Sequence, residues 1–370
     1  MKTKRFYFGL AMLSLLTWGC SSKDELSQNS ASQGSLKTSI SSNAQTLTAA
    51  VNSITTSAGY TLLNTQGQTS GPSMTKQSVA AIDSTYSQIL LTDISGVWDY
   101  KAALYKRWSA SLLRFFQNNG TSSDMIVRLP ESKVKNPNSL LRYSTADTTL
   151  TNNYVIDVSK YAYHFNRYLG WDYNLASNIS ISGVNAGDLT IQSSNHKTDG
   201  YHFTSSFAFA DGYTASTSYT TGDTIISAYN ISKASKTLYE EKFTAVKTRA
   251  NSRFREKEYS LTIGNVEIIR QAGPNNMDSA KVYVDGVLQL HSTVKIVADS
   301  IVVSNGTEST ITNHNRTIQI TFDDGTTTTV KALLGSTIDN ISTLFTSLRE
   351  TYFATGIVDW IAWDIYINKK

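Results

Sequence analysis

The sequence predicts an α+β protein: an N-terminal helical part, then a large antiparallel β-sheet system, sandwich-like or barrel-like, with one late helix. Two observations predict it. Apolar residues recur at steps of three and four before residue 120, and the period changes to two beyond residue 121. Three Asp-Gly pairs also join strand-like stretches, and consecutive hairpins imply antiparallel pairing because parallel strands need long crossovers.

The first 19 residues are predicted to be a signal peptide. Lys2, Lys4 and Arg5 precede a short apolar run at residues 10–16, which is too short to span a bilayer as a helix. The segment ends at Gly19-Cys20, and Cys20 is the only cysteine. Residues 20–35 are polar and favour a flexible tether between this signal and the folded part.

This N-terminus resembles a bacterial lipoprotein signal, in which the cysteine is acylated and becomes the new N-terminus. Lys23, Asp24 and Glu25 directly behind Cys20 resemble the short acidic export signal of surface-displayed lipoproteins of the Bacteroidota. The resemblance implies an outer-membrane protein that is lipid-anchored through Cys20 and exposed at the cell surface. The alternatives are an unmodified cysteine and a solvated tether that carries two acids.

Composition argues against nucleic acid as a partner. Removing residues 1–19 takes away three positive charges and no negative one, so the net charge falls from +4 to +1. Binding to nucleic acid depends on neutralising several phosphates, and the mixed charges of residues 242–258 are typical of a solvated strand or helix face. Without another cysteine, a hydrophobic core must hold the fold, and the lipid is the only membrane anchor expected.

The helical part is expected over residues 36–120. Its first helix carries an apolar stripe at Leu36, Ile40, Ala44, Leu47, Val51 and Ile54. This stripe favours a helix that lies on its own domain, with a coiled coil as the alternative. Further stripes predict helices over 79–89 and 98–116, and the sequence leaves open whether helices and sheet form one domain or two.

The β-rich part is expected over residues 121–370. Hairpins are predicted around Asp211-Gly212, Asp285-Gly286 and Asp324-Gly325. A capping-box pattern at 336–339 then begins a helix near 337–353. Residues 357–368 are expected to form a final strand, with Trp360, Asp364 and Tyr366 on one of its faces.

Few residues suggest catalysis. His196, Asp199 and His202 have side chains that suit zinc, but they span a predicted turn without an evident fourth ligand, so solvated histidines are the simpler interpretation and no metal is expected. The chain has no phosphate-binding glycine loop and no G-x-S-x-G elbow, so no cofactor and no serine nucleophile are predicted. Asp359 and Asp364 are candidate acids, although solvated side chains explain them more simply.

Aromatic and hydroxyl residues supply the remaining candidates. Trp360 and Tyr366 are candidate rings for stacking on a glycan, whereas the stripe from Tyr201 to Phe209 favours core packing. Five Asp-Ser/Thr sequences resemble the O-glycosylation motif of the Bacteroidota, and their acceptors are Ser84, Thr148, Thr224, Ser279 and Ser300.

We therefore expect a cell-surface lipoprotein that acts as a non-enzymatic binding or assembly component and docks other envelope proteins. The alternatives are a glycan-binding lipoprotein that captures polysaccharide for nutrition and a hydrolase whose acids are not identified.

Overall fold

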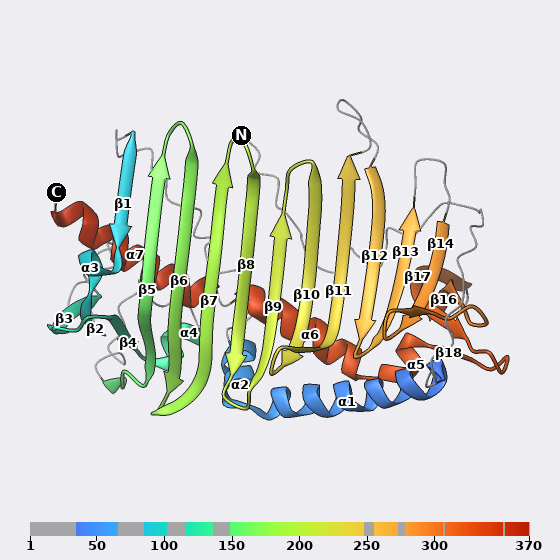
Figure 1. Ribbon diagram of the computed structural model, residues 1–370. Coiled ribbons are helices and arrows are strands. Elements are labelled where there is room, and N and C mark those ends of the chain that lie inside the picture. The colour runs from blue at the N-terminus through green and yellow to red at the C-terminus, as the bar shows by residue number, and fades with distance from the viewer. Residues whose placement is uncertain are drawn as a thin grey trace. The chain divides into compact units, whose positions relative to one another are not determined.

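The computed structural model (Figure 1) describes residues 35–65, 85–101, 115–135, 149–247, 255–272, 278–305, 308–350 and 352–369. The chain divides into two compact units. The first comprises residues up to Asn52 together with Asp223–Ser342, and the second comprises Ser53–Gly222 and Thr343–Lys370. Both units contain helices and strands, so the units do not follow a boundary between a helical part and a β part.

The second unit is built on one sheet with strand order β9-β8-β7-β6-β5-β4-β2-β3, and β1 pairs with β5. All of its strand pairs are antiparallel except β2 with β4. Its strands are β1 (Tyr86–Leu90), β2 (Gly96–Tyr100), β3 (Phe116–Gly120), β4 (Met125–Leu129), β5 (Tyr154–Asn166), β6 (Gly170–Ile181), β7 (Val184–His196), β8 (Gly200–Phe209) and β9 (Tyr213–Thr220). Its helices are α2 (Ala58–Thr65), α3 (Leu91–Ile94), α4 (Glu131–Lys135) and α7 (Tyr352–Lys369).

The first unit contains two antiparallel sheets. Strands β10 to β15 pair in chain order, and β17 pairs with both β16 and β18. The strands are β10 (Thr224–Lys233), β11 (Lys236–Lys247), β12 (Arg255–Ile263), β13 (Val266–Ala272), β14 (Asp278–Val284), β15 (Val287–Leu288), β16 (Thr293–Asn305), β17 (Glu308–Thr321) and β18 (Thr327–Thr329). Its helices are α5 (Val330–Leu334), most of α1 (Leu36–Thr56) and the first part of α6 (Thr337–Glu350).

Helices cover one face of the sheet in the second unit. Helix α2 approaches β7 and β8 so closely that a Cβ at Gly59 would lie 2.5 Å from the carbonyl oxygen of Ala186 and 2.9 Å from Cε1 of Phe207. Only glycine permits this approach. Helix α7 contacts the same face, where Trp363 packs edge-on against Tyr163 of β5 with ring centroids 5.2 Å apart.

The predicted stripe of α1 is confirmed as core, because all six of its apolar side chains are at most 3% exposed. Polar contacts in the first unit also join α1 to two hairpin turns. The Lys37 ammonium lies 2.8 Å from the Asp324 carboxylate in the β17–β18 turn. The Asn43 amide donates to the side-chain oxygen of Asn265 in the β12–β13 turn at 2.6 Å.

The α+β class is confirmed, as are the three hairpins and the late helix. Strands β8 and β9 pair across Asp211-Gly212, β14 and β15 across Asp285-Gly286, and β17 and β18 across the turn that holds Asp324-Gly325. Helix α6 begins at Thr337, as predicted. In the described part of each unit the strand path is open, which matches the sandwich-like alternative rather than a closed barrel.

The prediction of a helical part extending to residue 120 is wrong for three segments. Residues 86–90, 96–100 and 116–120 form β1, β2 and β3. In β1 the side chains of Ser87 and Ile89 are buried while their neighbours are not, so burial follows a period of two. The remaining parts of the two predicted helices, at 79–84 and 102–114, lie outside the described residues.

The predicted final strand is also wrong, because residues 352–369 form helix α7. The side chains with the least exposure are Ile357, Val358, Ile361, Ala362 and Ile365. Their spacing of one, three, one and three residues marks one helical face. Strand alternation would place Ile365 and Ile367 on the same face, but Ile365 is 5% exposed and Ile367 55%.

Candidate binding surface

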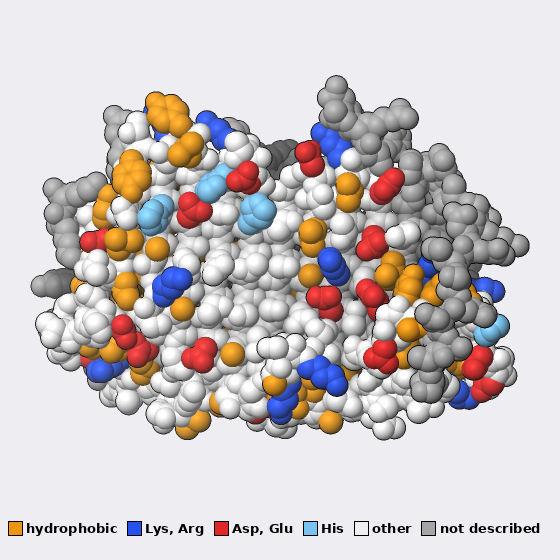
Figure 2. Space-filling model, in the orientation of Figure 1, with side chains coloured by type: hydrophobic (Ala, Val, Ile, Leu, Met, Phe, Trp, Pro, Cys, Tyr) orange, Lys and Arg blue, Asp and Glu red, His pale blue; other side chains and the backbone are white. Residues whose placement is uncertain are grey.

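The face of the second unit's sheet that α2 and α7 do not contact is lined by small polar side chains; we call it the open face. Strands alternate between the two faces, so the neighbours of buried Leu189, Ile191 and Phe207 point to the open face. They include Thr190, whose hydroxyl lies 2.7 Å from that of Ser206 on the next strand. Figure 2 views this side, and its middle is mostly white, the colour of uncharged polar side chains and of the backbone.

One cross-strand row on the open face concentrates hydrogen-bonding groups near the ends of the strands. The register places Gln88, His164, Asp172, Ser194 and His202 directly opposite one another on β1, β5, β6, β7 and β8. Directly opposite residues have their Cβ atoms about 5 Å apart and point to the same face. The row therefore brings together side chains that are widely separated in the sequence.

His196 lies on the same face as this row, two residues beyond Ser194 toward the end of β7. It faces Gly170 on one side and Gly200 on the other, so no side chain flanks it directly. Its Nε2 lies 3.1 Å from the Asp172 carboxylate, and its Nδ1 lies 3.9 Å from Oδ2 of Asp199. The Asp172 side chain is 58% exposed and the His196 side chain 33%, so the pair is open to a ligand.

The three residues that suggested zinc come near one another without forming a metal site. His196 and Asp199 are neighbours, but Nε2 of His202 lies 3.0 Å from the backbone oxygen of Asp199. Within the described ranges, no group of three or more His, Cys, Asp and Glu side chains is arranged to hold a metal ion.

Exposed apolar side chains lie at the same strand ends. Tyr168 and Leu169, in the β5–β6 turn, are 64% and 67% exposed, and Tyr86 at the start of β1 is 50% exposed. Figure 2 shows hydrophobic side chains at the upper left, beside the histidines. We call the set formed by Tyr86, Gln88, His164, Tyr168, Leu169, Asp172, His196 and His202 the rim.

The turn that carries Tyr168 is held on several sides. The Asn166 side-chain oxygen accepts from the backbone N–H groups of Tyr168 and Leu169 at 2.9 and 3.1 Å. The backbone N–H of Arg167 donates to the carbonyl of Thr85, and that of Lys197 donates to the carbonyl of Leu169. Gly170 then ends the turn with φ of +130°, a conformation that L side chains rarely adopt. The exposed side chains of Tyr168 and Leu169 therefore project from a fixed backbone.

The predicted stacking residues do not form a shared platform. Trp360 and Tyr366 are both half-buried on α7, and six residues on a helix separate them by about 120° around its axis. The Tyr366 ring packs edge-on against Trp363 at 5.9 Å, within the aromatic cluster that joins α7 to β5. The pairing proposed for these two residues rested on the strand and is wrong with it.

Asp359, a candidate acid, takes part in that same helix–sheet contact. Its carboxylate accepts a hydrogen bond from the Tyr161 hydroxyl at 3.1 Å. Burial, together with the charge of Asp359, raises the pKa of Tyr163 to about 12. The same two causes raise the pKa of the Tyr161 hydroxyl well above its ordinary value. These hydroxyls stay protonated, so the cluster fastens α7 to the sheet. Asp364 also lies on α7, half-buried.

A second half-buried carboxyl lies in the first unit. Glu241 accepts hydrogen bonds from the hydroxyls of Tyr259 at 2.9 Å and Tyr239 at 3.1 Å. Burial raises the pKa of Glu241, and the two hydrogen bonds only partly offset that effect. The cross-strand register places Arg270 opposite Tyr259 on the same face, where it is 8% exposed.

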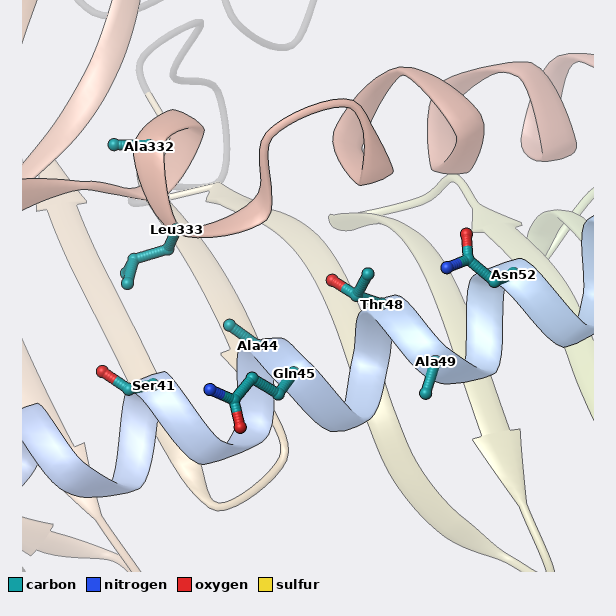
Figure 3. A pocket seen from close by; sticks show the side chains of 8 residues that line it. All are labelled: Ser41, Ala44, Gln45, Thr48, Ala49, Asn52, Ala332 and Leu333. Atoms are coloured by element: carbon teal, nitrogen blue, oxygen red, sulfur yellow. The ribbon is translucent and has the colours of Figure 1, made fainter.

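Helices α1 and α5 of the first unit enclose a shallow groove of about 520 Å³ (Figure 3). Its lining is small and uncharged, and consists of Ser41, Ala44, Gln45, Thr48, Ala49, Asn52, Ala332 and Leu333. A charged group that would orient a ligand is not among these residues, in contrast to the rim.

The aromatic stripe from Tyr201 to Phe209 divides into two halves. Phe207 and Phe209 are buried core, as predicted. Tyr201 and Phe203 are half-buried, and the Tyr201 ring lies 6.2 Å from Trp171 and 6.1 Å from Tyr219. These rings occupy the face opposite the rim.

The predicted modification sites stay predictions. Cys20, Lys23, Asp24, Glu25, Ser84 and Thr148 lie outside the described residues. Thr224 begins β10 and is half-exposed, while Ser279 and Ser300 belong to β14 and β16.

No protein-family model, curated protein or solved structure matches the chain. In the ranges that the structure describes, no helix combines the length and the apolar character needed to cross a membrane.

Proposed function

We propose that the protein is a non-enzymatic binding component of the outer membrane, held at the cell surface by lipid on Cys20, and that it binds through the rim. The observation that carries the proposal is the pairing of exposed apolar side chains with a row of polar ones on a fixed backbone. Tyr168 and Leu169 are the most exposed of the large apolar residues described. Exposed apolar groups with polar neighbours are typical of binding sites.

Two kinds of ligand fit a surface component of this kind. One is another envelope protein, in which case the protein serves assembly. The other is a polysaccharide captured for nutrition, and the polar row of the rim favours this second candidate, because sugar hydroxyl groups need several hydrogen-bonding partners at once.

Gentle extraction of the native protein distinguishes a protein partner from a polysaccharide ligand. A stoichiometric membrane-protein partner that co-purifies with the wild type, and is lost from a Tyr168→Ala variant, favours assembly. Retention on a polysaccharide column favours glycan capture. If the extracted protein carries no partner and no column retains it, the binding proposal is wrong.

The proposed location at the cell surface is tested separately. A membrane-impermeant reagent should label the protein on intact cells. Replacing both Asp24 and Glu25 by alanine should abolish this labelling, because the variant would no longer reach the outer surface. Replacing Gln28 and Asn29 by alanine instead changes two tether residues outside the export signal and serves as the matched control. Labelling of the wild type that appears only after lysis contradicts surface exposure.

A further inference from the structure

We infer that the rim is a subsite for one ring of a neutral glycan, in which Tyr168 stacks on the sugar while Asp172 and His196 hold its hydroxyl groups. The inference rests on the proposed binding function and names the ligand class of the same surface. Three features of the rim carry it: its exposed aromatic ring, its hydrogen-bonding row and its charge balance.

The aromatic ring comes first. A pyranose presents a flat patch of C–H groups, which packs against the face of an aromatic ring, and tyrosine adds a hydroxyl at its edge. Tyr168 is 64% exposed although large apolar groups are usually covered. Because Asn166 and the neighbouring backbone fix its turn, little freedom is lost on binding. Tyr86, whose hydroxyl donates to Gln88 at 2.6 Å, adds a second ring nearby.

The hydrogen-bonding row supplies partners for hydroxyl groups. Both carboxylate oxygens of Asp172 lie 3.1 Å from Nε2 of His196, and the carboxylate has further acceptor positions because two oxygens offer about four lone pairs. Because His196 pairs with Gly170 and Gly200, the two cross-strand positions directly beside it carry no side chain. Hydrogen bonds to a charged acceptor are stronger than those between neutral groups, which favours Asp172 as the main partner of a hydroxyl.

The charge balance sets the class of glycan. The two turns at this end carry Arg167 and Lys197, both exposed, and Asp172 and Asp199 supply two negative charges. The charges cancel, so the surface attracts neither a polyanion nor a polycation. A bilayer that carries anionic headgroups is likewise disfavoured, because membrane-surface contacts usually combine apolar groups with a surplus of Lys and Arg.

The test uses the full lipidated chain, extracted in mild detergent and run in native gels that contain one soluble polysaccharide. The neutral probes are β-glucan, galactomannan and arabinoxylan, and polygalacturonate is the anionic one. The variants are Tyr168→Ala and Asp172→Asn. Their matched controls, Val184→Ala and Asp188→Asn, change an equally accessible apolar residue and an exposed acid at the opposite end of β7.

We expect a neutral probe to retard the wild type and both controls equally. Each rim variant should bind about tenfold or more weakly, which corresponds to the loss of one good contact. Unchanged thermal unfolding of Tyr168→Ala and Asp172→Asn establishes that both variants fold.

Three results overturn the inference. Equal retardation of all variants places glycan binding elsewhere on the protein and leaves the proposed function standing. Retardation by polygalacturonate alone refutes the neutral class. Absence of retardation by any probe, together with a co-purifying protein that is lost from Tyr168→Ala, assigns the rim to a protein partner instead.

Discussion

Glu241 is the residue whose ionisation should couple most clearly to stability. Because burial raises its pKa in the folded state, the fold binds the proton more tightly than the unfolded chain does. The resulting stability is fully present below the ordinary pKa of a glutamate and is lost as the pH rises through the folded value.

The first prediction follows from this loss of stability with rising pH. Glu241→Gln should raise the melting temperature at pH 7 relative to the wild type, and the gain should shrink toward pH 4, since glutamine does not titrate. Thermal unfolding followed by circular dichroism across pH 4–7 measures it. Glu240→Gln, on the other face of β11, serves as the control. A difference between Glu241→Gln and wild type that is constant with pH contradicts the account.

The second prediction concerns the carboxylate of Asp359. Asp359→Ala removes the acceptor of a buried Tyr161 hydroxyl and should destabilise the fold by about 1–3 kcal/mol. Denaturant unfolding provides the measurement. In a Tyr161→Phe background the same change should cost less, because the hydroxyl is already gone; an equal cost in both backgrounds rules out the hydrogen bond as the cause.

Among the elements, α1 offers the sharpest distinction between core and docking surface. Leu47 and Val51 are fully buried, so replacing both by aspartate should lower the melting temperature markedly, at several kcal/mol for each buried charge. Gln45→Asp, on the exposed side of the same helix, should leave the melting temperature nearly unchanged. If the double variant melts like the wild type and only loses a partner, the stripe is a docking surface.

Elements were predictable where local chemistry determines them. Asp-Gly pairs mark hairpins because their turns need positive φ, which Asp285 and Gly286 both adopt. The stripe of α1 has one consistent period. The segment 357–368 satisfies both a period of two and a helical spacing, and only its packing against α3, β1 and β5 decides for the helix.

At the scale of the whole molecule, the rim was beyond prediction from the sequence. His196, Asp199 and His202 stood out because they are close in the chain, whereas Asp172, His164 and Gln88 join them only through lateral strand register. A large exposed pair in the turn "RYLG" was the one local signal, since such turns usually carry small polar residues.

The central claim is that this chain binds a ligand at the cell surface through the rim. The most direct measurement is the binding of a fluorescently labelled neutral polysaccharide to intact cells that carry the full chain. We predict that cells with the wild type or with the Val184→Ala and Asp188→Asn control bind it. Cells with Tyr168→Ala and Asp172→Asn should be labelled equally by the impermeant reagent yet fail to bind. Equal binding by both variants, or binding that appears only after lysis, contradicts the account.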